Sequence, residues 1–465
     1  MTPAMRKLIL SVLLIAALAR PALSGEAPGR ILLENGKPVP YSLQDPERKV
    51  RIPAAPRIRE NEMRGVWVST IWNLDFPGSR DAKSFRAAYQ KMVKQMKEAG
   101  FTAVFFQVRP LNDAFYPSRL NPWSRYLFGQ EGKASDEKDF DPLDWMIRTT
   151  HQAGLEFHAW LNPFRISAGT DASTSGYLAT LDPANFAVKK PKLVLAVPRK
   201  DGKKVLILNP GEPEVVLFLT DTIREILEKY PVDGIHFDDY FYPYEEMGDA
   251  DKATYAKYAA KDVSLEEWRR ENVNRLILAA GKLIRAHNKS TGAKVRFGIS
   301  PFGIWANLTG ERPSSPEALE EWKNTPSSPL GSQTKGFQSL FDQYADTRRW
   351  VKNQWIDYIA PQIYWGFASP KSPYGALVDW WAETVRETGV DLYIGVSVSR
   401  MGNAADSIRH DELTDQLKYN MGRSEVAGEI FFSWKSVSQP ENNLMKKAVR
   451  SLIEEQWKGH APFPR

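Results

Sequence analysis

Two adjacent carboxylates lie at the end of one apolar, strand-like segment. The segment runs from Asp233 to Pro243 with the sequence DGIHFDDYFYP, and Asp238 and Asp239 follow its apolar part. Side chains alternate between the two faces of a strand, so His236 and Asp238 are expected on one face. Repulsion between the carboxylates and partial desolvation by neighbouring aromatic rings both raise a carboxyl pKa. A carboxyl that keeps its proton near neutral pH can act as a general acid.

Two residues of this segment have a structural alternative. Asp239 follows the point where the strand is expected to end, so it either reaches the cleft, caps the next helix or pairs with an arginine. Asp233 stands at the start of the strand, and we expect it to be structural because that end of a barrel serves stability. Asp238 is therefore the stronger catalytic candidate of the adjacent pair.

Polar and aromatic residues also gather at the ends of other strand-like segments. Aromatic faces stack on the apolar faces of sugars, while amide and guanidinium groups bond sugar hydroxyls. The mixture predicts a carbohydrate-binding mouth. The candidate substrate-binding residues are Arg109, His158, Trp160, Asn162, Arg165, His236, Tyr240, Gln362, Trp365 and Trp434.

No spacing in the sequence indicates a metal or a nucleotide. His158 and His236 with Asp238 are a conceivable ligand set, but they lack His-x-x-x-His or facial-triad spacing, and a histidine inside a barrel usually holds a hydrogen bond. Helix-opening Gly-x-Gly-x-x-Gly, P-loop and Gly-x-Ser-x-Gly motifs are missing. The chain has no cysteine, which excludes thiol catalysis. We expect no cofactor and no metal.

These residues must be positioned by a parallel α/β fold. From Met63 onward strand-like and helix-like segments alternate eight times, which predicts a (β/α)8 TIM barrel. The expected strands are 65–70, 102–109, 155–162, 234–239, 294–300, 358–364, 392–398 and 429–434. The expected helices are 82–99, 142–153, 214–230, 265–288, 343–354, 374–388, 411–420 and 444–456. The carboxyl ends of such strands meet at one face, where barrel active sites lie.

Two connections at that face are too long for simple turns. They cover residues 163–212 after the third strand and 301–342 after the fifth, and both contain aromatic and leucine residues suited to packing. We expect these long loops to build the walls of a substrate cleft. Unfolded insertions are the alternative.

The composition is that of an ordinary globular protein, and two further segments precede the predicted barrel. Of 465 residues, 42% are hydrophobic and 25% charged, and the formal net charge is +6 with both signs spread along the chain. So small an excess mainly favours solubility, with some attraction to anionic surfaces such as a cell wall, and we expect no nucleic-acid partner. The predicted domains are a signal peptide (1–24), a linker or arm (25–60) and the barrel (61–460).

The first residues have the pattern of an export signal. Arg6 and Lys7 precede an apolar run from Leu8 to Leu18, which is too short to span a membrane. The segment Ala22-Leu23-Ser24 before Gly25 supplies the small residues that a signal peptidase needs. Lipidation needs a cysteine, and the chain has none. We therefore expect a periplasmic or secreted protein without a stable membrane anchor.

Five ordered motifs indicate a family. They are MRGVW from Met63, QVRP from Gln107, WLNPFR from Trp160, DGIHFDDY from Asp233 and PQIYW from Pro361. Over at least residues 60–400 the chain resembles the glycosyl-hydrolase-like 10 family of exported bacterial proteins. The resemblance implies a (β/α)8 barrel, an envelope location and hydrolysis of cell-wall or related amino-sugar glycans. Many members are lipoproteins, a feature that this cysteine-free chain does not share.

A more distant similarity is to the family 18 chitinases. In those enzymes strand four ends in alternating acids, a tyrosine of strand six holds the substrate's N-acetyl group, and a tryptophan of strand eight lies under the sugar. Asp238, Tyr364 and Trp434 stand at similar places, which implies a catalytic role for Tyr364. The catalytic glutamate of the chitinases is replaced here by Tyr240, so the acid must be Asp238 or Asp239.

The sequence thus predicts a glycoside hydrolase acting on β-linked amino-sugar glycan, with peptidoglycan strands as the favoured substrate. A second carboxylate comes from a loop, with Asp113, Glu245 and Glu246 as candidates, or the substrate's acetamido oxygen attacks instead. We favour the acetamido mechanism, with one aspartate as acid and the other orienting the group. The rival hypothesis is a non-catalytic glycan-binding barrel of the cell envelope, which has no use for two adjacent acids.

Overall fold

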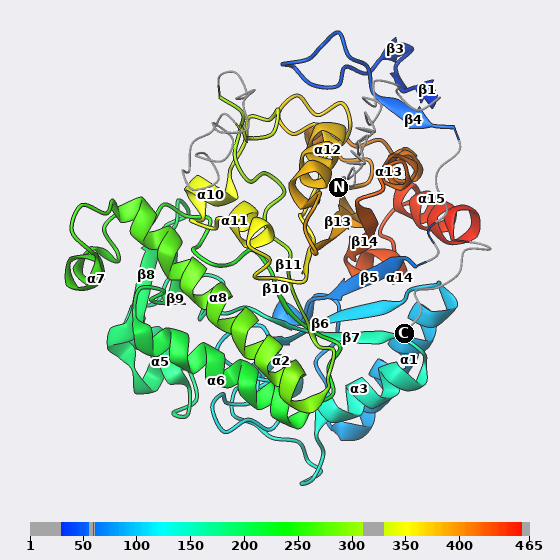
Figure 1. Cartoon of the computed structure of the whole chain (residues 1–465). Helices are drawn as coiled ribbons and strands as arrows, with labels where there is room; N and C mark the ends of the chain where they lie inside the picture. The colour runs from blue at the N-terminus through cyan, green and yellow to red at the C-terminus, as the bar shows by residue number, and fades with distance from the viewer. Residues whose placement is uncertain (1–28, 55–58, 60, 310–329, 458–465) are drawn as a thin grey trace, which may run out of the picture.

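A computed structural model describes residues 29–54, 59, 61–309 and 330–457 of the chain. Eight parallel strands close into a barrel in the order β10-β11-β12-β13-β14-β5-β6-β7, with helices around it (Figure 1). Each barrel strand therefore pairs with the barrel strands that come before and after it along the chain, and β14 closes onto β5. The predicted (β/α)8 TIM barrel is confirmed.

The barrel strands lie close to the predicted segments. They are β5 (Met63–Val68), β6 (Ala103–Arg109), β7 (Glu156–Leu161), β10 (Gly234–Phe237), β11 (Arg296–Ile299), β12 (Tyr358–Ile359), β13 (Asp391–Ser397) and β14 (Val426–Phe432). β10 ends at Phe237, so the two aspartates begin the following loop. β12 is only two residues long, and the chain after it makes isolated bridges from Gln362 to Phe302 and Gly395.

Helices follow the strands as the α/β alternation requires. The main ones are α1 (Ala82–Glu98), α3 (Pro142–Gln152), α6 (Pro213–Lys229), α8 (Leu265–Thr291), α11 (Thr347–Lys352), α12 (Tyr374–Val385), α13 (Glu412–Met421) and α15 (Asn443–Ser451). Shorter ones are η1 (Ile71–Asn73), α2 (Arg125–Phe128), α4 (Thr174–Leu178), α5 (Phe186–Lys189), η2 (Pro191–Leu193), α7 (Lys252–Tyr258), α10 (Ser339–Asp342), η4 (Val398–Arg400), η5 (Ala404–Asp406), α14 (Trp434–Ser438) and η6 (Leu452–Gln456).

Local signals set where these helices begin and end. The Asp81 side chain accepts from the Ser84 backbone N–H at 2.7 Å and starts α1, whereas Gly292, with φ 77°, ends α8 in the left-handed conformation. α11 is shorter than predicted because Tyr344 has a left-handed φ of 54°, which interrupts the helix. The helix starts only after Asp346, whose carboxylate accepts from the backbone of the first turn.

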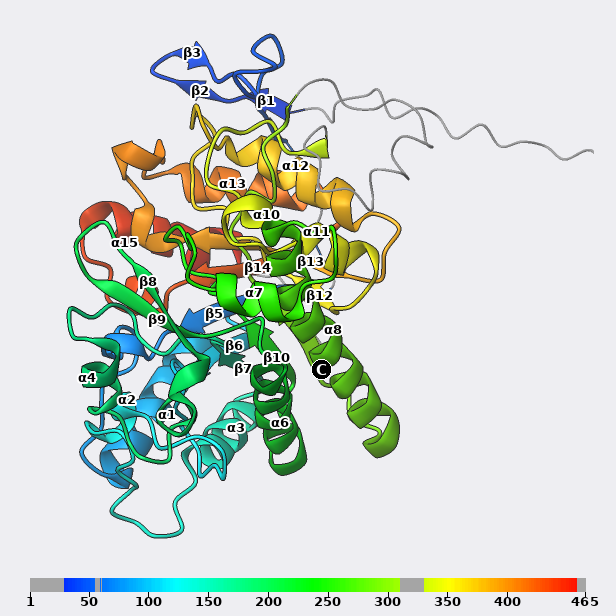
Figure 2. The same cartoon turned by 90° about the vertical axis from the view of Figure 1, so that its left-hand side faces the viewer.

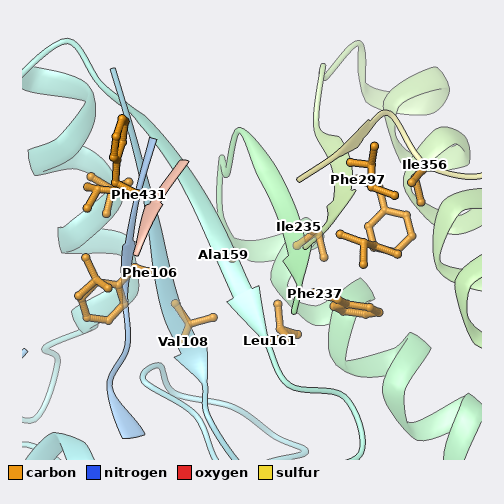
Figure 3. Packing of buried hydrophobic residues seen from close by; sticks show 14 of the residues in the cluster. Phe106, Val108, Ala159, Leu161, Ile235, Phe237, Phe297, Ile356 and Phe431 are labelled. Carbon is orange, nitrogen blue, oxygen red and sulfur yellow. The ribbon is translucent and has the colours of Figure 1, made fainter. Parts of the chain in front are cut away.

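Alternate residues of each strand face two different cores. One set points outward and packs between strands and helices, as Figure 3 shows for Phe106, Val108, Ala159, Leu161, Ile235, Phe237 and Phe297. The other set fills the barrel interior with Met63, Trp67, Ala103, Phe105, Trp160, Tyr358, Ala360, Tyr393 and Ile430. Strands buried on both faces read as nearly continuous apolar runs, which is how the sequence revealed them.

The long connection after β7 folds into a hairpin. Strands β8 (Val194–Pro198) and β9 (Lys204–Leu208) pair antiparallel, and β9 is bridged on its other edge to Arg165 and Thr170 (Figure 2). The expectation of a folded wall is met in this loop, and the alternative of an unfolded insertion is wrong for it. In the loop after β11, residues 310–329 lie outside the described residues.

Residues 29–54 form two small sheets that lie on α12 and α13. The pairs are β1 (Gly29–Ile31) with β4 (Arg51–Pro53), and β2 (Leu33–Glu34) with β3 (Lys37–Pro38). Tyr41 and Tyr419 both donate to the Asp379 carboxylate, at 2.9 and 3.0 Å, and Arg423 pairs with it at 2.8 Å. Within the described ranges, no helix has the length and apolar character that a membrane span requires. The predicted signal peptide lies outside these ranges.

Candidate active site

A cavity of about 540 Å³ opens where the barrel strands end. Residues that belong to or follow all eight barrel strands line it, so the whole carboxyl-terminal face contributes. They include Trp67, Trp72, Gln107, Trp160, Arg165, Arg199, Val205, Ile207, Asp238, Asp239, Tyr240, Tyr244, Glu245, Ser300, Phe302, Gln362, Tyr364, Trp365, Arg400 and Phe432. The mixture of aromatic, amide, guanidinium and carboxylate groups is suited to a polar ligand with apolar faces, as sugars have.

Asp238 and Asp239 both line this cavity while remaining almost fully buried. Their residues are 4% and 3% exposed. Asp238 Oδ1 accepts from the Tyr240 backbone N–H at 3.2 Å, and Asp239 Oδ2 accepts from the Tyr244 hydroxyl. The Gln343 side chain donates to the Asp239 backbone carbonyl at 2.8 Å. Because β10 ends before the pair, strand alternation no longer forces the two carboxyls onto opposite faces.

Burial raises the pKa of both acids, by different amounts. It raises the pKa of Asp238 well above the ordinary value, and the neighbouring Asp239 charge raises it further. Burial also raises the pKa of Asp239, to about 6, against opposing hydrogen bonds from Tyr244 and Gln362. Hydrogen bonds oppose the rise at both carboxyls, but the pKa of Asp238 is raised further because the Asp239 charge adds to its burial, so Asp239 is the first of the two to ionise. Asp238 then holds the proton, and the cavity floor combines one acid with one anion.

Other predicted residues surround the pair. The Arg165 guanidinium lies 4.0 Å from the centre of the Tyr240 ring and lowers the pKa of both aspartates. The Tyr364 ring stacks on Phe432 with centroids 6.1 Å apart. The structure thus brings eight predicted residues together at the cavity: Trp160, Arg165, Asp238, Asp239, Tyr240, Gln362, Tyr364 and Trp365.

Arg109 and Asn162 do not line the cavity, so their predicted place in a sugar-binding surface needs correction. Arg109 is fully buried and donates to the backbone carbonyls of Asn162 at 2.6 Å and Pro163 at 3.1 Å. Asn162 accepts from the Trp160 indole N–H at 2.9 Å. Both side chains therefore hold the ends of β6 and β7 in place, and Asn162 orients Trp160, which does face the cavity.

His158 and His236 are also outside the cavity lining, in a buried column beneath its floor. The Trp67 indole N–H donates to His236 Nε2 at 3.1 Å; His236 Nδ1 lies 3.1 Å and His158 Nδ1 3.0 Å from the Tyr358 hydroxyl. Since an indole can only donate, Nε2 of His236 accepts and Nδ1 carries the proton. Burial lowers the pKa of His236 well below the ordinary value, so the ring stays neutral. The column orients Trp67, a cavity residue.

Trp434 lies in the hydrophobic core rather than beneath a sugar site. It is the first residue of α14, is 6% exposed, and packs edge-on against Phe101 at 6.2 Å. β14 ends at Phe432, and that residue lines the cavity instead. The place that the chitinase similarity implied for Trp434 is therefore taken by Phe432, two residues earlier in the chain.

Several cavity residues were not identified from the sequence. Trp72 is 68% exposed and lines the cavity from η1, directly after β5. Its backbone is held at a left-handed φ of 53°, which turns the chain at this point. Arg199 of the hairpin and Arg400 of η4 also line the cavity. A tryptophan placed just after a predicted barrel strand was a signal that could have identified Trp72.

Of the loop carboxylates considered as catalytic partners, Glu245 alone lines the cavity within the described part of the chain. It pairs with Arg199 at 3.4 Å. Asp113 is fully buried elsewhere, and Glu246 is solvent-exposed away from the lining. For the residues that the structure describes, no group of three or more His, Cys, Asp or Glu side chains is placed to hold a metal ion.

Comparisons with known proteins agree with the fold and identify a family. The model of the family Glycosyl hydrolase-like 10 matches residues 62–411. The chain is 37% identical over 389 residues to glycosyl hydrolase YngK of Bacillus subtilis (strain 168), covering 82% of this chain and 69% of YngK. It is 34% identical over 440 residues to glycosyl hydrolase DigH of Escherichia coli (strain K12), covering 90% of this chain and 92% of DigH.

A solved structure supports the same fold. The glycoside hydrolase domain of PgaB (BpsB) from Bordetella bronchiseptica is similar with a TM-score of 0.51 at 15% identity, covering 85% of this chain and 99% of that domain. The family match, over residues 62–411, contains all five motifs identified in the sequence. The chain therefore belongs to the glycosyl hydrolase-like 10 family.

Proposed function

We propose that the protein is an exported glycoside hydrolase that cleaves amino-sugar glycan, with peptidoglycan strands as substrate and Asp238 as general acid. The observation that carries this proposal is the pair of adjacent buried carboxyls on the floor of an aromatic cavity, where burial raises the pKa of both and that of Asp238 the more. Two relatives that carry the name glycosyl hydrolase support the reaction class. The apolar run near the N-terminus supports export.

The two acids suit a mechanism in which the substrate supplies the nucleophile. The acetamido oxygen of the sugar attacks its anomeric carbon while Asp238 gives its proton to the departing glycosidic oxygen. Ionised Asp239 accepts from the acetamido N–H, and the Tyr364 hydroxyl steadies the group. Water then opens the oxazolinium intermediate and gives its proton to Asp238, which restores the acid. Two displacements at one carbon retain the anomeric configuration.

Zymography and reducing-end assays test the proposal directly. Purified protein should release new reducing ends from peptidoglycan glycan strands, assayed with and without stem peptides. Strands that are bound by the protein but never cut would instead favour the non-catalytic glycan-binding barrel.

Turnover should follow a bell-shaped pH profile. Asp239 acts as an anion, so kcat/KM falls as the pH drops below its pKa of about 6. Asp238 acts as an acid, so kcat/KM falls again as the pH rises through its raised pKa. The profile is measured on soluble glycan strands.

Tyr244→Phe provides the matched test of that profile. It removes a hydrogen bond that stabilises ionised Asp239, so the acidic limb should move to higher pH. An acidic limb that stays in place in this variant would show that Asp239 does not control it.

Trp72 is expected to bind a sugar ring at the cavity rim. Trp72→Ala should raise KM for long strands by about 3- to 10-fold, with kcat almost unchanged, because aromatic stacking contributes roughly 0.5–1.5 kcal/mol. Leu217→Ala, at a 63%-exposed position on α6 outside the cavity lining, is the control and should leave KM unchanged. Equal KM values for Trp72→Ala and the parent would exclude Trp72 from binding.

A further inference from the structure

The net positive charge of this protein is concentrated in one segment of the chain. Residues 189–204 hold seven cations and a single acid, Asp201, and so carry a formal charge of +6, equal to that of the whole chain. The remaining residues, in which both signs are spread along the chain as expected, balance to zero. The cations are Lys189, Lys190, Lys192, Arg199, Lys200, Lys203 and Lys204, from the end of α5 through the β8–β9 hairpin.

Few of these cations are neutralised. Lys190 pairs with Glu214 at 2.6 Å, and Arg199 pairs with Asp201 at 3.2 Å and Glu245 at 3.4 Å. The other five have no carboxylate within ion-pair distance in the part of the chain that the structure describes; four of them are solvent-exposed and one is half-buried: Lys189, Lys192, Lys200, Lys203 and Lys204. Such unpaired surface cations attract anionic ligands in a salt-dependent way.

The hairpin places this charge beside the cavity. Arg199, Val205 and Ile207 line the cavity, and the Lys203 backbone carbonyl accepts from the Arg199 N–H at 2.8 Å, so Lys203 lies across the turn from a cavity residue. Each strand of the hairpin has five residues, and a rise of about 3.3 Å per residue places the turn roughly 16 Å from the base of the hairpin. Since Arg199 of this turn lines the cavity, the cationic turn extends one wall of the cavity outward. A polymer that runs out of the cavity along this wall meets Lys203 and Lys200.

We propose that the hairpin turn, residues 199–204, is a docking surface for the carboxylate-bearing part of the glycan strand that lies outside the cavity. The proposal rests on the proposed function, since the polymer in the cavity is the one that passes the hairpin. Carboxylates along the strand meet a row of unpaired ammonium groups, which raises the local concentration of substrate at the mouth.

Binding measured without turnover tests this surface. In an Asp238→Asn background, affinity is measured for soluble peptidoglycan strands with free carboxylates and for the same strands after methyl esterification. Lys200→Glu/Lys203→Glu should weaken binding of the free-carboxylate strands about tenfold at low salt, with the difference shrinking at high salt. Binding of esterified strands should be weak and equal for both proteins.

The matched control is Lys282→Glu/Lys289→Glu on α8, which makes the same charge change toward the opposite end of the barrel. The proposal is overturned if the control weakens binding as much as the hairpin variant, or if the hairpin variant binds free-carboxylate strands like its parent. Loss of binding to anionic phospholipid vesicles, with glycan binding unchanged, would assign the surface to membranes and overturn it too. Failure of wild-type protein to cut any strand is a separate result, because these measurements need no turnover.

Discussion

Asp238→Asn is expected to lower turnover of glycan strands at least about a hundredfold, a loss of about 2.7 kcal/mol of transition-state stabilisation or more. The amide N–H is far too weak an acid to protonate the leaving oxygen, although the amide fills the same buried space. Asp239→Asn should cost a similar factor, because it removes the anion that orients the acetamido group. The two losses should not add fully, since the acids act as a unit.

Stability separates this catalytic loss from unfolding. Burial favours the uncharged form of both carboxyls, so a neutral amide should leave the thermal midpoint unchanged or raise it. Asp113→Asn is the matched control, because burial also raises the pKa of Asp113 to about 6 and its side chain is fully buried outside the cavity lining. It should keep near-normal turnover. Near-normal turnover in both Asp238→Asn and Asp239→Asn would instead show that the site is wrongly assigned.

Tyr364→Phe is expected to reduce kcat by roughly 10- to 1000-fold, or about 1.4 to 4 kcal/mol, with little change in strand binding. Tyr364 lines the cavity near both acids, where its hydroxyl is proposed to hold the acetamido group against the anomeric carbon. Its hydrogen bond should strengthen as charge develops on that group. Single-turnover rates and strand affinity measured on the same variant distinguish this effect from a loss of binding.

A thiazoline mimic of the cyclised intermediate is the complementary probe. It should inhibit competitively and bind more tightly than the parent sugar, because it resembles the intermediate. Covalent labelling of a carboxylate by a 2-fluoro sugar, without thiazoline inhibition, would contradict the acetamido mechanism. Glu245 would then be the first residue to test as nucleophile, since it lines the cavity, where it pairs with Arg199.

The periodicity of the sequence was enough to predict the barrel and to find the two acids. Runs buried on both faces identified the strands, and parallel strands bring their carboxyl ends to one face. Asp238, Asp239, Trp160 and Tyr364 could be assigned to the mouth because each follows or ends such a run. Periodicity does not fix the residue at which a strand ends. Trp434 was therefore expected at the cavity, whereas β14 ends two residues earlier, at Phe432.

Tertiary structure alone decided how deep each inward side chain lies. His236 lies within β10 and belongs to the buried column, whereas Asp238 follows the end of the strand and reaches the cavity floor. Arg109 and Asn162 likewise satisfy buried backbone carbonyls and an indole N–H, needs that arise only once the strands are packed. The hairpin that gathers the net charge beside the cavity depends on antiparallel pairing within a long loop. Strand periodicity encodes the face of a residue, whereas depth, contacts and the spatial clustering of charge come from packing.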